Sequence, residues 1–326
     1  MTLRAALAPS SIAIVGASDN PHKVGGRPIL YMKRYGYRGA IYPINPGRAE
    51  VQGLKAYKAI GEVPVAPDLA VIAVAGDEAV RAVEECAAKG VRVAVVMTSG
   101  FGELGAEGKR SQARMAAAAQ AAGMRLVGPN CQGLANFATG AVANFSTVFH
   151  EIEARDGPVA IVSQSGACSQ AIYVLARQRG LDVRHVHATG NEADVTVADL
   201  AEEIVREEGV RLVLLYMEAI QRPEVLARAA ELARARDLPI VAVKAGRTQS
   251  GVQAASSHTG ALASEDRVID AFFARHSLIT HQKGDVVSIF FKQLIALCRV
   301  GGAQYFKFIA KDSLEVDEGF FLVINI

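Results

Sequence analysis

The residue with the clearest chemical potential is His258, which lies in a turn of small and polar residues, SSHTGALA. Small neighbours leave an imidazole accessible, and the flanking hydroxyl and amide groups can receive phosphoryl oxygens. A neutral imidazole nitrogen is a competent nucleophile toward an acyl phosphate near pH 7. The pattern is therefore compatible with a phosphorylated histidine, although an isolated histidine in a loop is more often simply exposed to solvent.

Two loops rich in glycine and serine could receive phosphate groups, because each follows a predicted strand and precedes a predicted helix. The first, VGASDNPHKVGG, starts at Val15 and includes Lys23, and the second, SQSG, covers 163–166. Backbone amides at a helix start, together with the helix dipole, favour an anion. The alternatives are a tight turn with a solvated lysine in the first loop and an ordinary serine N-cap in the second.

Three further polar side chains lie on predicted strands or at their ends. Glu218 follows the strand Leu212–Met217, at the edge where α/β sites form, and its carboxylate could hold one tautomer of an imidazole. A solvated acid that begins a loop is the alternative. His185 and His187 share a strand face, as metal ligands can, but no third ligand follows at a recognised spacing. We expect both histidines to be packing residues and expect no metal site.

The elements that must position these residues are short β-branched strands alternating with alanine-rich helices. This alternation predicts an α/β fold with two doubly wound parallel sheets. One helix is predicted over Asp77–Lys89, closed by Gly90, and another begins near Gly25 and Gly26. The predicted strands are 11–15, 39–43, 69–74, 92–97 and 125–127 in the first series, and 159–162, 183–187, 212–216 and 240–243 in the second.

The predicted domains are residues 1–145 and 155–280, with the boundary at Gly157-Pro158, followed by an atypical tail over 281–326. In the tail the Ala- and Arg-rich style gives way to Phe, Ile and Lys, and six of the chain's 12 Phe fall there. Such a shift suggests a different origin, for instance a truncated reading frame or a fusion, so the tail carries no functional inference.

Bulk composition excludes several classes of protein. The 326 residues carry a formal net charge of +2 and no Trp, which argues against nucleic acid and anionic membranes as partners. No apolar run approaches the ~18 residues of a membrane span, and the four cysteines are scattered, which is typical of reduced thiols. We expect a cytoplasmic protein.

Seven stretches in order resemble the ADP-forming acyl-CoA synthetases, which are related to the α subunit of succinyl-CoA synthetase. They are VGASDNPHKVGG, YPINP, SGFGE, GPNCQG, SQSG, GNEADVTVADL and SSHTGALA, and they cover about residues 8–280. The resemblance implies a Rossmann-like CoA-binding domain followed by a flavodoxin-like ligase domain. It also implies that acyl-CoA and phosphate give acyl phosphate and CoA, that a histidine takes the phosphoryl group, and that ADP accepts it to form ATP.

The resemblance assigns roles to particular residues. It implies that His258 is phosphorylated with support from Glu218, and that the helix start at Ser165 and Gly166 cradles the phosphoryl group. Asn130 of GPNCQG would lie near the thioester and phosphate. The CoA-contacting positions that it implies are Gly16, Ala17, Ser18, Lys23, Pro43 and Asn45.

The family completes its cycle with an ATP-grasp module, on the same chain or on a β-type subunit, and nothing in this sequence resembles one. Mg²⁺ and the nucleotide, ADP or ATP, would then enter through that missing or partner module. The leading hypothesis is the CoA-side component of such a synthetase. A CoA- or acyl-CoA-binding module or remnant without turnover stays open, as do the acyl group and the oligomeric state, a homo-oligomer included. A dinucleotide oxidoreductase ranks last, because the first loop departs from GxGxxG and no acidic residue ends the second strand.

Overall fold

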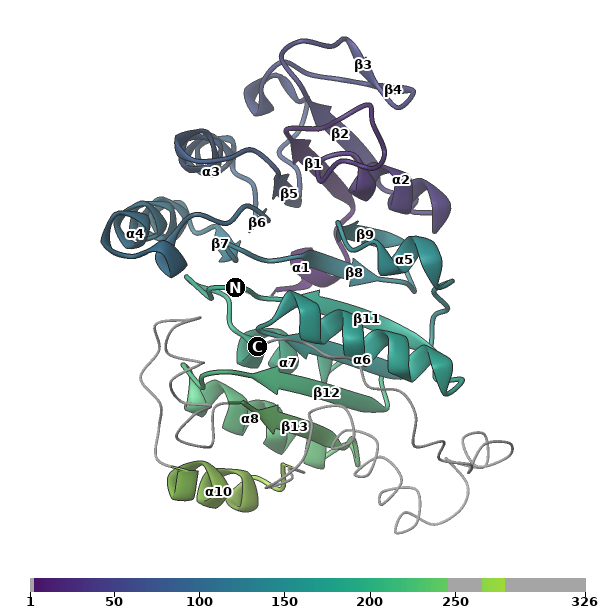
Figure 1. Ribbon diagram of the computed structural model, residues 1–326, viewed down its shortest axis with the longest axis vertical. Coiled ribbons are helices and arrows are strands. Elements are labelled where there is room, and N and C mark those ends of the chain that lie inside the picture. The colour runs from purple at the N-terminus through teal and green to yellow at the C-terminus, as the bar shows by residue number, and fades with distance from the viewer. Residues whose placement is uncertain (1–2, 246–265, 279–326) are drawn as a thin grey trace.

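Two sheets organise the part of the chain that the computed structural model describes, residues 3–245 and 266–278 (Figure 1). The first sheet has five parallel strands in the order β2-β1-β5-β6-β7. Its strands are β1 (Ser11–Val15), β2 (Ala40–Ile44), β5 (Leu69–Ile72), β6 (Val93–Val96) and β7 (Arg125–Val127). These five strands lie where the sequence predicts them, within two residues at each end.

Helices cover both faces of the first sheet because its buried strands carry apolar side chains on both faces. Ile12 and Ile14 of β1 pack in one cluster with α1 (Arg4–Leu7) and α2 (Arg27–Arg34). Ala13 faces the other way, into the cluster that contains α3 (Asp77–Lys89) and α4 (Ala106–Ala121). Helix α3 has the predicted bounds and ends at Gly90, which is left-handed with φ 85°.

The second sheet has six strands in the order β13-β12-β10-β11-β8-β9. Four of them are parallel and match the predicted strands: β10 (Val159–Ser163), β11 (Val183–Ala188), β12 (Leu212–Met217) and β13 (Ile240–Lys244). Helix α6 (Gly166–Gln178) packs against one face, and α7 (Val197–Ile204) and α8 (Pro223–Arg234) against the other. The predicted α/β class with two doubly wound sheets is confirmed.

An antiparallel hairpin that the sequence reasoning did not predict completes the second sheet. Strands β8 (Gly133–Asn136) and β9 (Ala141–Asn144) pair with each other, and β8 pairs with β11. The hairpin lies inside the predicted first domain, 1–145, yet its hydrogen bonds belong to the second sheet. The boundaries 1–145, 155–280 and 281–326 stay predictions, and all of the last range lies outside the described residues.

The remaining elements are short or peripheral: β3 (Glu50–Val51), β4 (Leu54–Lys55), the 3₁₀ turns η1 (Ile60–Glu62) and η2 (Gly102–Leu104), α5 (Val148–Glu151) and α10 (Asp266–Arg275). Within the described ranges, every helix is too short or too polar to cross a membrane.

Strand order fixes where ligands can bind in such sheets. In both parallel arrays the first strand in sequence, β1 or β10, has the second on one side and the third on the other. The chain therefore leaves β1 and β10 at a topological switch point, where α/β folds open a crevice at the carboxyl ends of the strands. The two loops rich in glycine and serine follow these two strands.

Candidate functional site

The first loop turns sharply at Gly16, which has φ 83°. The amides of Gly16 and Ala17 both donate to the carbonyl of Ile44 at 3.2 Å, and the Asn45 side chain donates to the carbonyl of Ala17 at 2.9 Å. These bonds tie the loop to the end of β2. Asn45 thus supports the loop from the neighbouring strand.

Two close approaches explain the glycine pair before α2. A Cβ on Gly25 would lie 2.1 Å from the carbonyl oxygen of Gly16, and one on Gly26 would lie 2.0 Å from that of Asn20. Gly26 is the N-cap of α2, so the helix begins where the sequence predicts it. The start of α2 can therefore press against the loop.

The other predicted CoA-contacting residues differ in accessibility. Lys23 is exposed and Ser18 is half-buried, so both can meet a ligand on this loop. Pro43 is buried within β2, and its carbonyl accepts a hydrogen bond from the amide of Tyr57 at 2.9 Å.

The second loop forms the capped start of α6. Ser165 is the N-cap, and its hydroxyl accepts from the amide of Cys168 at 3.3 Å. The hydroxyl of Ser163 accepts from the amide of Ser165 at 3.1 Å and donates to its carbonyl at 2.6 Å. The N-cap alternative is thus confirmed. The amides of Gly166 and Ala167 are in the first turn, where a helix supplies no acceptor of its own.

Glu218 begins the loop after β12 and faces the same helix start. Its amide donates to the side-chain oxygen of Gln164 in the second loop. Burial raises the pKa of the Cys168 thiol, and the negative charge of Glu218 raises it further. The carboxylate of Glu218 therefore lies close enough to the first turn of α6 to influence Cys168.

The GPNCQG loop, which follows β7 of the first sheet, reaches the start of α6. A Cβ on Gly166 would lie 2.5 Å from Cγ of Gln132, so the Gln132 side chain crosses directly over the start of α6. Asn130 has φ 57°, and its side chain donates to that of Asn191 at 3.2 Å. Of the predicted catalytic residues, the structure gathers Ser165, Gly166 and Glu218 around the start of α6. The loop of Asn130 reaches Gly166 through Gln132.

The predicted phosphohistidine, His258, lies outside the described residues, and so does its proposed proximity to the second loop. The other two histidines weighed from sequence are buried and hydrogen-bonded, as packing residues should be. His187 Nε2 lies 3.0 Å from His185 Nδ1, and His185 Nε2 lies 2.9 Å from a carboxylate oxygen of Glu207.

A buried carboxylate next to the site was missed by the sequence reasoning. Glu192 is 5% exposed, and its oxygens accept from Gln164 at 2.6 Å, Thr189 at 2.8 Å and the amide of Val197 at 2.7 Å. Burial raises its pKa to about 7, although the three donors act in the opposite direction. The signal was present, since Glu192 lies in the GNEADVTVADL stretch just after β11.

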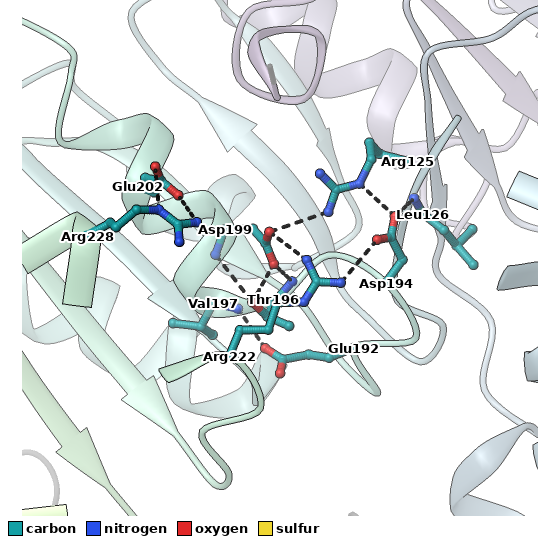
Figure 2. Close-up of polar contacts among 10 residues, drawn as sticks. All are labelled: Arg125, Leu126, Glu192, Asp194, Thr196, Val197, Asp199, Glu202, Arg222 and Arg228. Atoms are coloured by element: carbon teal, nitrogen blue, oxygen red, sulfur yellow. Dashed lines mark hydrogen bonds and ion pairs between the residues drawn. The ribbon is translucent and has the colours of Figure 1, made fainter. Parts of the chain in front are cut away.

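An ion-pair network holds the two sheets together beside this carboxylate (Figure 2). Arg125 of β7 contacts Asp194 at 2.9 Å and Asp199 at 3.5 Å. Arg222 contacts the same two acids, at 3.7 Å and 2.9 Å respectively. Asp199 also closes a capping box with Thr196 at the start of α7. Two arginines and two aspartates therefore fix the segment after β11 against the start of β7.

Comparison with known families finds both expected domains. Residues 10–136 match a CoA binding domain, and residues 156–288 match the succinyl-CoA ligase like flavodoxin domain.

Relatives and a solved structure agree with this match. The chain is 37% identical over 285 residues to the α subunit of ADP-forming acetate–CoA ligase I from Pyrococcus furiosus, covering 86% of this chain and 60% of that subunit. It is 38% identical over 271 residues to an ADP-forming acetate–CoA ligase from Methanocaldococcus jannaschii, covering 83% of this chain and 37% of the relative.

The solved structure is the dinucleotide-forming acetyl-coenzyme A synthetase 1 of Candidatus Korarchaeum cryptofilum in complex with phosphate and ADP. It matches with a TM-score of 0.79 and 32% identity, over 86% of this chain and 60% of that chain. The chain thus spans about three-fifths of the length of the α subunit and of the solved synthetase. Both predicted domains are found in the predicted order, and the chain belongs to the ADP-forming acyl-CoA synthetase family, of which it carries the CoA-binding and succinyl-CoA ligase-like domains.

Proposed function

We propose that the chain is the CoA-side component of an ADP-forming acyl-CoA synthetase. In the first step phosphate attacks the acyl carbon of acyl-CoA, the thioester C–S bond breaks, and acyl phosphate and CoA form. An imidazole nitrogen of His258 then attacks phosphorus, the carboxylate leaves, and a phosphohistidine remains. ADP takes the phosphoryl group in the last step, which yields ATP and restores His258.

One observation carries the proposal: the GPNCQG loop of the first sheet reaches the α6 start of the second, with Gln132 packed over Gly166. An acyl-CoA held at the first loop could therefore present its thioester near Asn130, beside the amides that would hold phosphate. Phosphoryl transfer depends chiefly on position and on stabilised charge, which a helix start can supply.

The residue roles follow from this arrangement. Ser165 and Gly166 would hold the travelling phosphoryl group, and Glu218 would orient the imidazole of His258. The loop with Gly16, Ala17, Ser18 and Lys23, supported by Asn45 and Pro43, would bind CoA. Helix starts hold the anions here, and Mg²⁺ would enter with the nucleotide.

An ATP-grasp β-type subunit or domain would bind ADP and accept the phosphoryl group from His258. The acyl group stays open, because pocket shape rather than motif sets specificity for the acid. We expect these steps to take place in the cytoplasm.

Phosphoryl labelling tests the function directly. Incubation with acyl phosphate labelled at phosphorus should give an acid-labile, base-stable phosphoprotein, and His258→Ala should abolish the label. His150→Ala, which changes an exposed histidine, is the matched control and should keep it. Label retained in the His258 variant would remove that residue from its role. CoA binding by calorimetry without any label would favour the binding-module alternative.

A further inference from the structure

Glu192 has no role in the proposed chemistry, yet it is a buried acid next to the start of α6 that accepts three hydrogen bonds. Its carboxylate lies between the loop after β10, the turn after β11 and the first turn of α7. Figure 2 shows its contact with Val197 in that first turn. A buried carboxylate is costly unless its oxygens accept hydrogen bonds, and three donors meet those of Glu192.

The Gln164 side chain is the link from Glu192 to the site. Its Nε2 donates to Glu192 at 2.6 Å and to the carbonyl of Ala219 at 2.9 Å. Its Oε1 accepts from the amides of Glu218 and Ala219. Both hydrogens and both lone pairs of this amide are therefore used, and three of the four bonds hold the backbone turn that begins at Glu218.

Only one orientation of the Gln164 amide satisfies these partners. A flipped amide would place its NH₂ against two backbone N–H donors and its oxygen against the carboxylate of Glu192. Glu192 thus fixes the outer end of Gln164 and ties it to the amide of Val197 at 2.7 Å, in the first turn of α7. The turn that carries Glu218 is anchored through one side chain to one buried acid.

The backbone around Glu192 extends this anchoring to the first sheet. Gly190 and Glu192 both have positive φ, 63° and 53°, so the chain makes a tight turn here. Asn191, between them, uses its side chain to contact Asn130 at 3.2 Å and Glu103 at 2.5 Å. Neighbouring residues of one turn therefore contact the loops of both sheets.

We infer that Glu192 is a positioning residue, which acts through Gln164 to hold the turn of Glu218 at the start of α6. The functional part of this inference rests on the proposed function, in which Glu218 supports the phosphorylation of His258. The structural part does not depend on it.

Glu192→Gln is the informative variant because it keeps the shape and removes one acceptor. In one orientation its NH₂ meets the NH₂ of Gln164, and in the other it meets the amide of Val197. Either conflict should loosen Gln164. We expect hydrogen exchange of the Glu218 and Ala219 amides, followed by NMR, to speed up about 10-fold or more. Phosphoryl labelling should slow by about 10-fold, which is the size of effect seen when the hydrogen-bond partner of a metal-binding side chain is removed.

A control variant and a double-mutant cycle distinguish a positioning role of Glu192 from a general loss of stability. Glu207→Gln alters another hydrogen-bonded acid, the partner of His185, and should change neither readout. In a double-mutant cycle, Glu192→Gln added to Glu218→Gln should slow labelling no further, because Glu192 acts through Glu218. Additive losses would overturn the inference, and so would unchanged amide exchange in the Glu192 variant.

A measurement on the unaltered protein covers the case in which the variant does not fold. The Glu218 and Ala219 amides should exchange at least 10-fold more slowly than the amide of the exposed Gln221. Equal rates would refute the anchoring. Changed exchange without any phosphoprotein in the wild type would keep the anchoring and reject the proposed function, so the two failures are distinguishable.

Discussion

The ionisation of Glu192 predicts an unusual dependence of stability on pH. Burial has the largest effect on the pKa of this carboxyl group, which is raised from the ordinary 4.5 to about 7. The network can accept the extra proton: the Thr189 hydroxyl lies 2.8 Å from one Glu192 oxygen and 3.3 Å from the carbonyl of Ser163. A protonated Glu192 could donate to Thr189, which would then donate to Ser163.

The direction and magnitude of this pH dependence follow from the difference in the pKa of Glu192 between the folded and unfolded states. The folded state holds this proton more tightly than the unfolded chain, so the contribution to stability is fully present below about pH 4.5. It is lost as the pH rises through about 7. A pKa change from 4.5 to about 7 corresponds to a loss of about 3 kcal/mol in the free energy of unfolding.

Urea unfolding of the wild type and of Glu192→Gln between pH 4.5 and 8.5 measures this loss. The donor conflict in the variant lowers its stability by a similar amount at every pH, so the difference between the two proteins isolates the titration. We expect the wild type to lose about 3 kcal/mol relative to the variant across this range. A difference in the free energy of unfolding between the two proteins that does not change with pH would refute the reasoning. If the stability of the wild type relative to the variant rose with pH, the three donors would be shown to keep Glu192 ionised.

Three further perturbations test other parts of the structure. Burial holds the pKa of His187 well below its ordinary 6.5, so stability should fall below pH 6.5 with a limiting slope of about 1.4 kcal/mol per pH unit. His187→Phe should flatten that slope in urea unfolding. Arg125→Met should cost about 1–3 kcal/mol, because two acidic partners lose a guanidinium; an unchanged urea midpoint would contradict this. Gly166→Ala should cost about 1–3 kcal/mol through its clash with Gln132 and slow phosphoryl labelling, whereas Gly61→Ala, with open space around it, should leave the melting temperature unchanged.

The strands and the loops after them could be predicted because their signals are local. Buried parallel strands appear as short β-branched runs, and β1, β7 and β10 to β13 lie where those runs lie. Since the carboxyl ends of parallel strands share one edge, the sequence also placed Ser165 and Glu218 at a common edge. The family resemblance then supplied roles that local pattern alone left open, such as that of Asn130.

The contacts that join the parts could not be predicted, because they depend on residues distant in sequence. Gln164 meets Glu192 across 28 positions, and Arg125 meets Asp194 across 69. The left-handed backbone at Glu192, with φ 53°, is also hidden from sequence, since non-glycine residues seldom adopt it. The hairpin β8–β9 was missed because its strands are short and contain Gly133 and two asparagines.

The same hairpin limits how a chain of this kind can be recombined. A crossover at Gly157 would leave behind two strands and expose the edge of β11, which could then pair with another chain. The side chain of Asn136 also donates to the carbonyl of Leu7 at 2.9 Å, so the segment fastens α1 as well. Swaps between homologous genes should therefore keep everything downstream of Cys131 in one inherited block, with the amino-terminal helix taken from the same parent.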